Sequence, residues 1–170
     1  MPLPDPVPGL VISYAYLWRD QQDQGRDEGA KDRPCVVVLA VTQEEGERIV
    51  TVAPITHTAP RHARDAIELP AATKRRLGLD DERSWIVATE LNRFLWPGPD
   101  LRAVPGKAGE FAYGSLPRRL VLQLKQRIWS CIETSVFVWF HGRSMKKRTP
   151  DEAAATYRGG VRASLLWADI

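Results

Sequence analysis

The sequence has few of the residues that most often hold metal ions. Among its 170 residues only two are cysteines, Cys35 and Cys131, and only three are histidines, His57, His62 and His141. Neither set has the close spacing of a zinc site, and two cysteines this far apart are typical of small buried thiols. The sequence therefore predicts no metal centre built on histidine or cysteine ligands.

Long hydrophobic runs are also lacking. The longest, residues 136–140, is far shorter than the roughly 20 apolar residues that a transmembrane helix needs. Residues 1–8 carry a proline at every second position and have neither the basic nor the apolar stretch of a secretory signal. We therefore expect a cytoplasmic protein without a membrane segment, with an extended proline-rich arm over residues 1–8.

Neither sign of charge dominates, since 24 Lys and Arg stand against 21 Asp and Glu, for a net charge of +3. Two groups of basic residues, within 61–76 and 143–148, could attract a polyanion, but a solvated surface explains either group as well. The length and the apolar fraction of 44% suit one globular domain with a real core.

Runs of β-branched and aromatic residues predict short strands at 9–18, 35–41, 48–55, 66–69, 84–91 and 111–113. The second and third of these form a hairpin across a turn at 43–47. Residues 19–32 are rich in glycine, acids and amides, which indicates a surface loop. Residues 70–79 are expected to form a brief helix that ends at Gly78.

An amphipathic helix is predicted near the end of this pattern. Ser115 is expected to cap it, Pro117 suits its first turn, and leucine or isoleucine recurs every four residues from Leu120 to Ile132. The expected fold class is therefore mainly β with helices (α+β): a small β-barrel with a packed C-terminal amphipathic helix. Residues 141–170 form a basic tail of uncertain order.

Two polar residues stand at the ends of the central β-branched runs. Arg33 leads into one run and Thr56 ends the next. A guanidinium and a hydroxyl can both bind a phosphate group. The strand pattern by itself favours structural roles for both residues, as an ion-paired arginine and as a turn at the end of a strand.

Four short segments follow one another in the chain: GLVI at 9–12, KDRPCVVVL at 31–39, VAPIT at 52–56 and GSLP at 114–117. In this order they resemble the toxins of the MazF/PemK type, the endoribonuclease half of bacterial toxin-antitoxin pairs. The resemblance implies an SH3-like barrel, with a toxin domain over residues 9–140. It also implies a homodimer, an antitoxin partner, and cleavage of single-stranded RNA without a metal or other cofactor.

The family's catalytic arginine and threonine correspond to Arg33 and Thr56. Because a guanidinium keeps its proton, we assign Arg33 to stabilise the phosphorane that forms when the ribose 2′-OH attacks phosphorus. Thr56 holds a non-bridging oxygen, and the products are a 2′,3′-cyclic phosphate and a 5′-OH. The general base stays open: His57 comes first, because an imidazole titrates near neutral pH, with Glu28 and Glu90 as rivals.

Further residues are expected to contact RNA around this pair. Lys31, Arg61 and Arg64 would meet phosphates, and Trp18 would stack on a base. Phe94 and Trp96, expected in loops, could add stacking surfaces. Exposed aromatic rings fit a protein interface as well, with a second copy or with an antitoxin.

Two other functions remain open at this point. One is a non-enzymatic poison of DNA gyrase like CcdB, because the end of the chain, residues 166–170, is loosely similar to the end on which that family's toxicity depends. The other is a degenerate barrel that only binds a partner protein.

Overall fold

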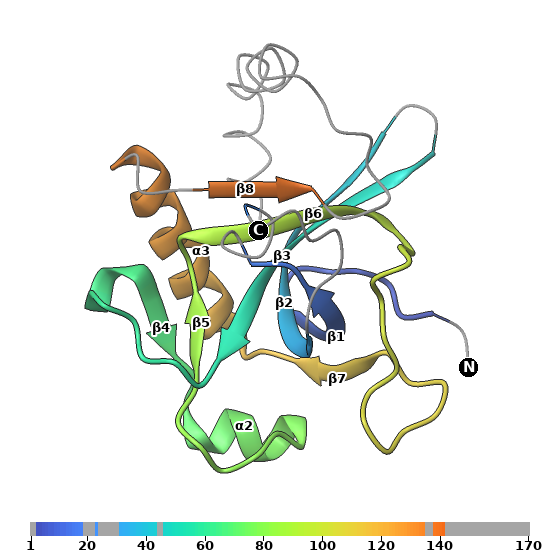
Figure 1. Ribbon diagram of the computed structural model, residues 1–170, viewed down its shortest axis with the longest axis horizontal. Helices are drawn as coiled ribbons and strands as arrows, with labels where there is room; N and C mark the ends of the chain where they lie inside the picture. Colours follow the sequence, from blue (N-terminus) through green and yellow to red (C-terminus); the bar gives the residue numbers. More distant parts are fainter. Residues whose placement is uncertain (1–2, 19–22, 24–30, 44–45, 135–137, 142–170) are drawn as a thin grey trace.

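The computed structural model describes residues 3–18, 23, 31–43, 46–134 and 138–141, and within them the chain forms a curved sheet with two α-helices (Figure 1). The strands are β1 (Leu10–Tyr16), β2 (Lys31–Thr42), β3 (Arg48–Thr56), β4 (Ala66–Glu68), β5 (Trp85–Val87), β6 (Glu90–Trp96), β7 (Ala112–Ser115) and β8 (Val138–His141). The helices are α2 (Ala71–Leu77) and α3 (Arg118–Glu133), and a single 3-10 turn, η1 (Ala63–Asp65), precedes β4. The predicted class, mainly β with helices in a small barrel, is confirmed.

The predicted hairpin is the centre of the sheet. β2 and β3 pair antiparallel, with Cys35 opposite Pro54 and Thr42 opposite Arg48. The strand order is β4-β5-β3-β2-β1-β7, and β6 also pairs with β3. The far end of β1 approaches β6, because Asn92 donates its side-chain amide to the Leu17 carbonyl over 3.2 Å. This contact links β6 to the chain just after β1, across the strands that lie between them in the sheet.

Side chains of the hairpin alternate between two buried clusters on opposite faces. Cys35, Val37 and Val52 belong to the cluster that also holds Tyr14 and Phe94, which we call the aromatic core. The other cluster, which we call the helix core, contains the remaining inward residues of β2 and β3 and the apolar face of α3. Each strand of the hairpin is therefore buried on both faces, which explains its nearly continuous apolar sequence.

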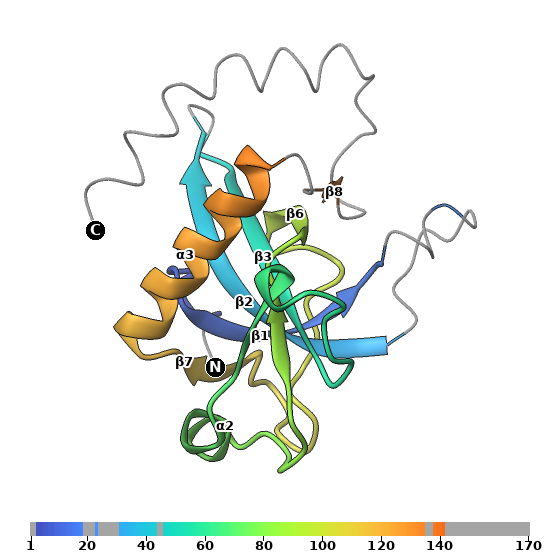
Figure 2. The ribbon, with the colours of Figure 1, turned by 90° about the vertical axis from the view of Figure 1, so that its left-hand side faces the viewer.

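Helix α3 lies across the helix-core face of the sheet (Figure 2). Its buried residues Leu120, Leu124 and Ile128 follow the predicted spacing of four. The start of the helix differs from the prediction: Ser115 is the last residue of β7, and Pro117 holds the N-cap position. The glycine-serine pair completes a strand here because β1 offers a partner for it, with Leu10 opposite Ser115.

Helix α2 ends as predicted at Gly78, which adopts the left-handed conformation with φ of 67°. A second glycine, Gly9, has φ of 93° and lies against α3 so closely that a Cβ atom there would come within 2.7 Å of Val121 Cγ2. No side chain fits at Gly9 without a shift of α3 or of the chain entering β1.

The predicted strand at 84–91 is in fact two strands. β5 and β6 both pair with β3, but a bend at Ala88 and Thr89 separates them. β6 continues to Trp96, so Phe94 and Trp96 lie in a strand rather than in loops, and Phe94 is fully buried in the aromatic core. The expectation that Phe94 stacks on RNA is therefore wrong.

The last described strand, β8, runs parallel to β6, with Glu90 opposite Val138. The sequence had shown this segment only as a short apolar run. The predicted tail begins at residue 141, and all of it after His141 lies outside the described residues. The division of the chain into 1–8, 9–140 and 141–170 stays a prediction.

Candidate active site at the end of β3

The ends of four adjacent strands meet at one edge of the sheet. β1, β2, β3 and β5 are neighbours and pair antiparallel, so the end of β1, the start of β2, the end of β3 and the start of β5 share one edge. At or just beyond these ends lie Trp18, Arg33, Thr56 and Trp85. The hairpin thus brings together the two residues that the sequence marked as a phosphate-binding pair.

Arg33 and Thr56 also share a face. The pairing of β2 with β3 ends with Cys35 opposite Pro54, two residues from Arg33 along β2 and two residues from Thr56 along β3. Cys35 and Val52 belong to the aromatic core, so the alternation of side chains directs Arg33 and Thr56 to that same face. They lie where the aromatic core ends and polar surface begins.

The Arg33 guanidinium lies against the Trp18 ring, with Cζ 5.3 Å from the ring centroid. Its Nε atom is buried and makes no hydrogen bond within the described part of the chain. A buried donor without a partner is unusual, because its lost hydration is not replaced. Arg33 therefore holds a donor that an anionic ligand could satisfy.

Cys35, two residues further along the same face, is not a nucleophile. Its thiol is fully buried, and burial raises its pKa far above the ordinary value, while the nearby Arg33 charge offsets this only in part. Because only the thiolate reacts readily, Cys35 is inert in the folded protein. Both cysteines are buried and free, as predicted.

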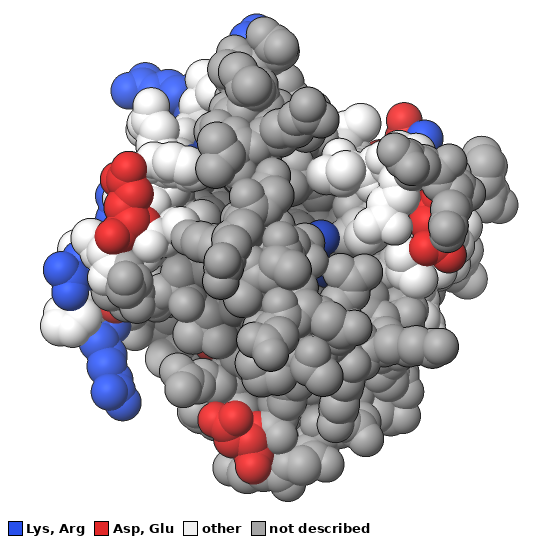
Figure 3. Space-filling model, turned by 90° about the horizontal axis from the view of Figure 1, so that it is seen from above, with Lys and Arg blue, Asp and Glu red and all other residues white. Residues whose placement is uncertain are grey.

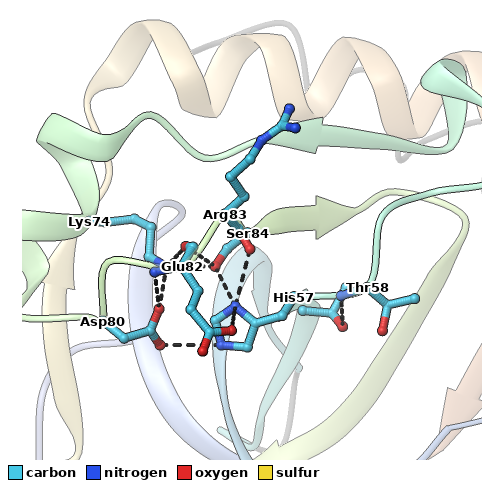
Figure 4. A network of polar contacts seen from close by, with 8 residues as sticks. His57, Thr58, Lys74, Asp80, Glu82, Arg83 and Ser84 are labelled. Carbon is cyan, nitrogen blue, oxygen red and sulfur yellow. Dashed lines mark hydrogen bonds and ion pairs between the residues drawn. The ribbon is translucent and has the colours of Figure 1, made fainter.

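Thr56 keeps a proton that it can donate. Its side chain is nearly buried, and Oγ1 accepts a hydrogen bond from the Thr58 backbone N–H over 3.2 Å (Figure 4). That bond uses a lone pair of the hydroxyl oxygen and leaves the O–H free to donate. The bond also fixes the oxygen relative to the turn that follows β3.

Glu90 starts β6 on the same face of the sheet. It shares that face with Phe94 of the aromatic core, and its carbonyl oxygen accepts a hydrogen bond of 3.1 Å from the Tyr16 hydroxyl. Burial raises the pKa of Tyr16 well above its ordinary value, and the Glu90 charge raises it further. The Glu90 carboxylate therefore lies near the end of β1, on the side of the sheet that carries Arg33.

His57 points to the opposite face, because it follows Thr56 directly in the strand direction. Its Nδ1 atom lies 3.1 Å from Ser84 Oγ, and its Nε2 atom lies 3.2 Å from Asp80 Oδ2 (Figure 4). Both ring nitrogens thus have partners on the segment between α2 and β5. The structure brings Glu90, and not His57, to the face of Arg33 and Thr56.

Lys74 is the centre of the network around His57. Its side chain is 5% exposed, and Nζ donates to Asp80 Oδ1 over 2.6 Å, to Ser84 Oγ over 2.7 Å and to the Glu82 carbonyl. Burial alone would raise the pKa of Asp80, but hydrogen bonds from Lys74 and from the Glu82 backbone lower it below its ordinary value. Lys74 is therefore buried and paired, and its predicted place in a basic surface group is wrong.

The other predicted RNA-binding residues lie at the surface. Lys31 is exposed at the start of β2, opposite Tyr16. Arg61 and Arg64 are exposed between β3 and β4, and the Arg64 Nε atom lies 3.8 Å from Asp65 Oδ1. Glu28 and the basic group at 143–148 lie outside the described residues. Seen from above, basic and acidic side chains of the described residues are interspersed (Figure 3).

One further pair of residues at this edge was not predicted from the sequence. Trp85 lies opposite Thr56, and the Arg83 guanidinium lies over its ring, with Cζ 5.2 Å from the centroid. The signal was the alternation in 83–86, where Ser84 and Ile86 are buried while Arg83 is exposed and Trp85 is half-buried. That alternation sets the tryptophan on the face of Thr56.

No group of three or more His, Cys, Asp or Glu side chains that could hold a metal ion occurs among the described residues. Within the same residues, no helix is both long and apolar enough to cross a membrane. The edge site therefore offers a guanidinium, a hydroxyl, a carboxylate and aromatic rings as its chemical groups.

These features define a small β-barrel protein with a polar, cationic site at one edge of an otherwise buried sheet. Residues 16–94 match the model of a family described as PemK-like, MazF-like toxin of type II toxin-antitoxin systems. The resemblance inferred from the sequence is thus confirmed over residues 16–94, which include Arg33 and Thr56. No curated protein and no solved structure matches the chain.

The matched range includes every described residue of the edge site, from Trp18 through Glu90, and it stops before α3. The loose similarity to the gyrase poisons depends on residues 166–170, which lie outside the described residues.

Proposed function

We propose that this toxin is an endoribonuclease that cleaves single-stranded RNA without a metal ion. The observation that carries the proposal is the buried Nε of Arg33, which has no hydrogen-bond partner among the described residues and lies at the sheet edge where β3 ends at Thr56. The family match supports the same chemistry. The substrate phosphate supplies the acceptor that Arg33 lacks.

In the proposed reaction the ribose 2′ oxygen attacks the adjacent phosphorus, and the bond from phosphorus to the 5′ oxygen breaks. Arg33 donates hydrogen bonds to the phosphorane, whose extra negative charge it stabilises in a partly dehydrated site. Thr56 donates its O–H to a non-bridging oxygen. The leaving 5′ oxygen takes a proton from water, and the products are a 2′,3′-cyclic phosphate and a 5′-OH.

The base that accepts the 2′-OH proton is proposed to be Glu90. Glu90 lies on the same face as Arg33 and Thr56, whereas the His57 ring is directed to the other face, toward Ser84 and Asp80. A general base must come within hydrogen-bond reach of the proton that it takes. Glu28 stays a candidate from the sequence alone.

The first experiment incubates the purified protein with labelled single-stranded RNA in excess EDTA. We expect fragments with cyclic phosphate ends, and we expect Arg33→Ala to lose about 100-fold or more of the rate, as removal of one transition-state donor does. Arg119→Ala is the matched control, because Arg119 is exposed on α3, away from the sheet edge. Equal activity of the two variants would exclude Arg33 from the chemistry.

Inert wild-type protein on varied RNAs would instead favour the barrel that only binds a partner. The base is tested by the pH dependence of the rate. Glu90→Gln should remove the acidic limb of the profile, whereas His57→Gln should leave that limb in place. The reverse result would assign the base to His57.

The quaternary structure belongs to the same proposal. We propose a homodimer, as the family resemblance implies, with the antitoxin binding where it blocks the edge site. Sedimentation of the free toxin and of its complex tests both parts, together with RNA cleavage measured at increasing antitoxin concentration.

A further inference from the structure

A row of directly opposed residues crosses the sheet at the proposed active site. Trp85 on β5 lies opposite Thr56 on β3, and on its other side it lies opposite Glu68 on β4. Directly opposed residues of antiparallel strands project to one face, with Cβ atoms about 4.5–5.5 Å apart. The Trp85 ring is therefore a next neighbour of the Thr56 hydroxyl.

Two charged side chains hold the surroundings of this ring in place. Arg83 donates from Nε to Glu68 Oε1 over 2.8 Å and from Nη2 to Glu68 Oε2 over 2.9 Å. This two-bonded geometry fixes the plane of the guanidinium, which lies over the Trp85 ring. Arg83 and Glu68 are both well exposed, so the pair and the ring that it covers lie at the surface.

The same combination of an arginine over a tryptophan ring occurs on the other side of Thr56, where Arg33 lies over Trp18. One tryptophan follows β1 and its arginine lies on β2, the other tryptophan lies at the start of β5, and β3 with Thr56 stands between β2 and β5. Unstacked RNA bases bind to aromatic rings and to arginine planes. A phosphate held by Arg33 and Thr56 has a nucleotide on each side, and each nucleotide carries a base.

We propose that Trp85, with Arg83 held by Glu68, binds the nucleobase of a nucleotide next to the scissile phosphate by stacking. The inference rests on the proposed function, since it takes single-stranded RNA as the ligand. It adds a binding site for a base, on the side of Thr56 away from Trp18. Stacking tolerates any base, so Trp85 contributes affinity and positions the strand rather than selecting a sequence.

The test measures binding of two fluorescently labelled decamers. One is a 2′-O-methyl RNA of randomised sequence, which cannot be cleaved because its 2′ oxygen is blocked. The other is an abasic decamer, which keeps the sugar-phosphate backbone and lacks all bases. The variants are Trp85→Leu and Trp85→Phe, with Trp129→Leu as the matched control, because Trp129 is 46% exposed on α3. Thermal unfolding confirms that each variant is folded.

We expect Trp85→Leu to weaken binding of the base-carrying decamer by about 5- to 150-fold, the range that stacking of one base supplies. Binding of the abasic decamer should change less than about twofold, and Trp85→Phe should restore most of the affinity. Trp129→Leu should bind both decamers like the wild type.

Equal weakening on both decamers would overturn the proposal, because Trp85 would then only support the position of Thr56. Unchanged binding of the base-carrying decamer would overturn it too. If the wild type still cleaves RNA in either case, the proposed nuclease function survives. If the wild type neither cleaves RNA nor binds either decamer, both proposals fail together.

Discussion

The buried ammonium of Lys74 offers the sharpest test of the structure. In Lys74→Met the side chain keeps most of its length and loses its ammonium group, while Asp80, Ser84 and the Glu82 carbonyl keep the groups that accepted its hydrogen bonds. Removal of one partner from a buried charged network is costly, because the remaining polar groups stay desolvated.

The magnitude follows from the exposure of the partners. A fully buried pair would cost about 3–5 kcal/mol. Here the Asp80 side chain is 53% exposed and regains water, and Ser84 Oγ keeps its contact with His57. We therefore expect Lys74→Met to lower the free energy of unfolding by about 2–3 kcal/mol. For a chain of this size that loss corresponds to roughly 4–12 °C in Tm.

The loss should also depend on pH. The folded-state pKa of Asp80 lies below its ordinary value of 3.8, so its charged form contributes stability above that value. The contribution disappears as the pH falls through the lowered pKa. The difference in stability between wild type and Lys74→Met should therefore be full near neutral pH and should narrow below about pH 4.

The assay is urea unfolding of the two proteins at neutral and acid pH, with Lys107→Met as the matched control. The Lys107 side chain is 52% exposed, and its Nζ atom lies 3.4 Å from Glu110 Oε2 at the surface. Its loss should cost less than about 1 kcal/mol. If Lys74→Met and Lys107→Met are equally stable, the buried position of Lys74 is refuted.

Two further predictions concern packing. Gly9→Ala should lower stability by about 2 kcal/mol or more, because φ is 93° and the new Cβ would meet Val121, whereas Gly106→Ala, with φ of 76° and open space around it, should cost only the backbone strain. Thermal unfolding of the two variants separates the steric contact with Val121 from the backbone strain, and equal Tm values would contradict the close approach of α3 to Gly9. Leu124→Ala should cost about 2–5 kcal/mol by leaving a cavity under α3, while Leu122→Ala, 39% exposed, should cost under about 1 kcal/mol by urea unfolding; similar costs would contradict the docking of α3.

Local sequence signals predicted most of the elements. The β-branched hairpin runs, the left-handed Gly78 and the spacing of four in α3 each reflect preferences that a few neighbouring residues determine. The predictions that were wrong depended on partners distant in sequence. Ser115 joins β7 because β1 lies beside it, and the run 84–91 breaks in two because β3 must pair with both halves.

The features of the candidate site also divide into those that local sequence determines and those that depend on distant partners. The sequence by itself determined the residue types and the order that mark Arg33 and Thr56, and the match over residues 16–94 includes both residues. Only the tertiary structure decided which face each side chain occupies: Glu90 and Trp85 lie with Thr56, His57 lies opposite, and Lys74 is buried. The physical reason is that a strand's sequence sets the alternation of its side chains, whereas pairing across the sheet sets which residues meet.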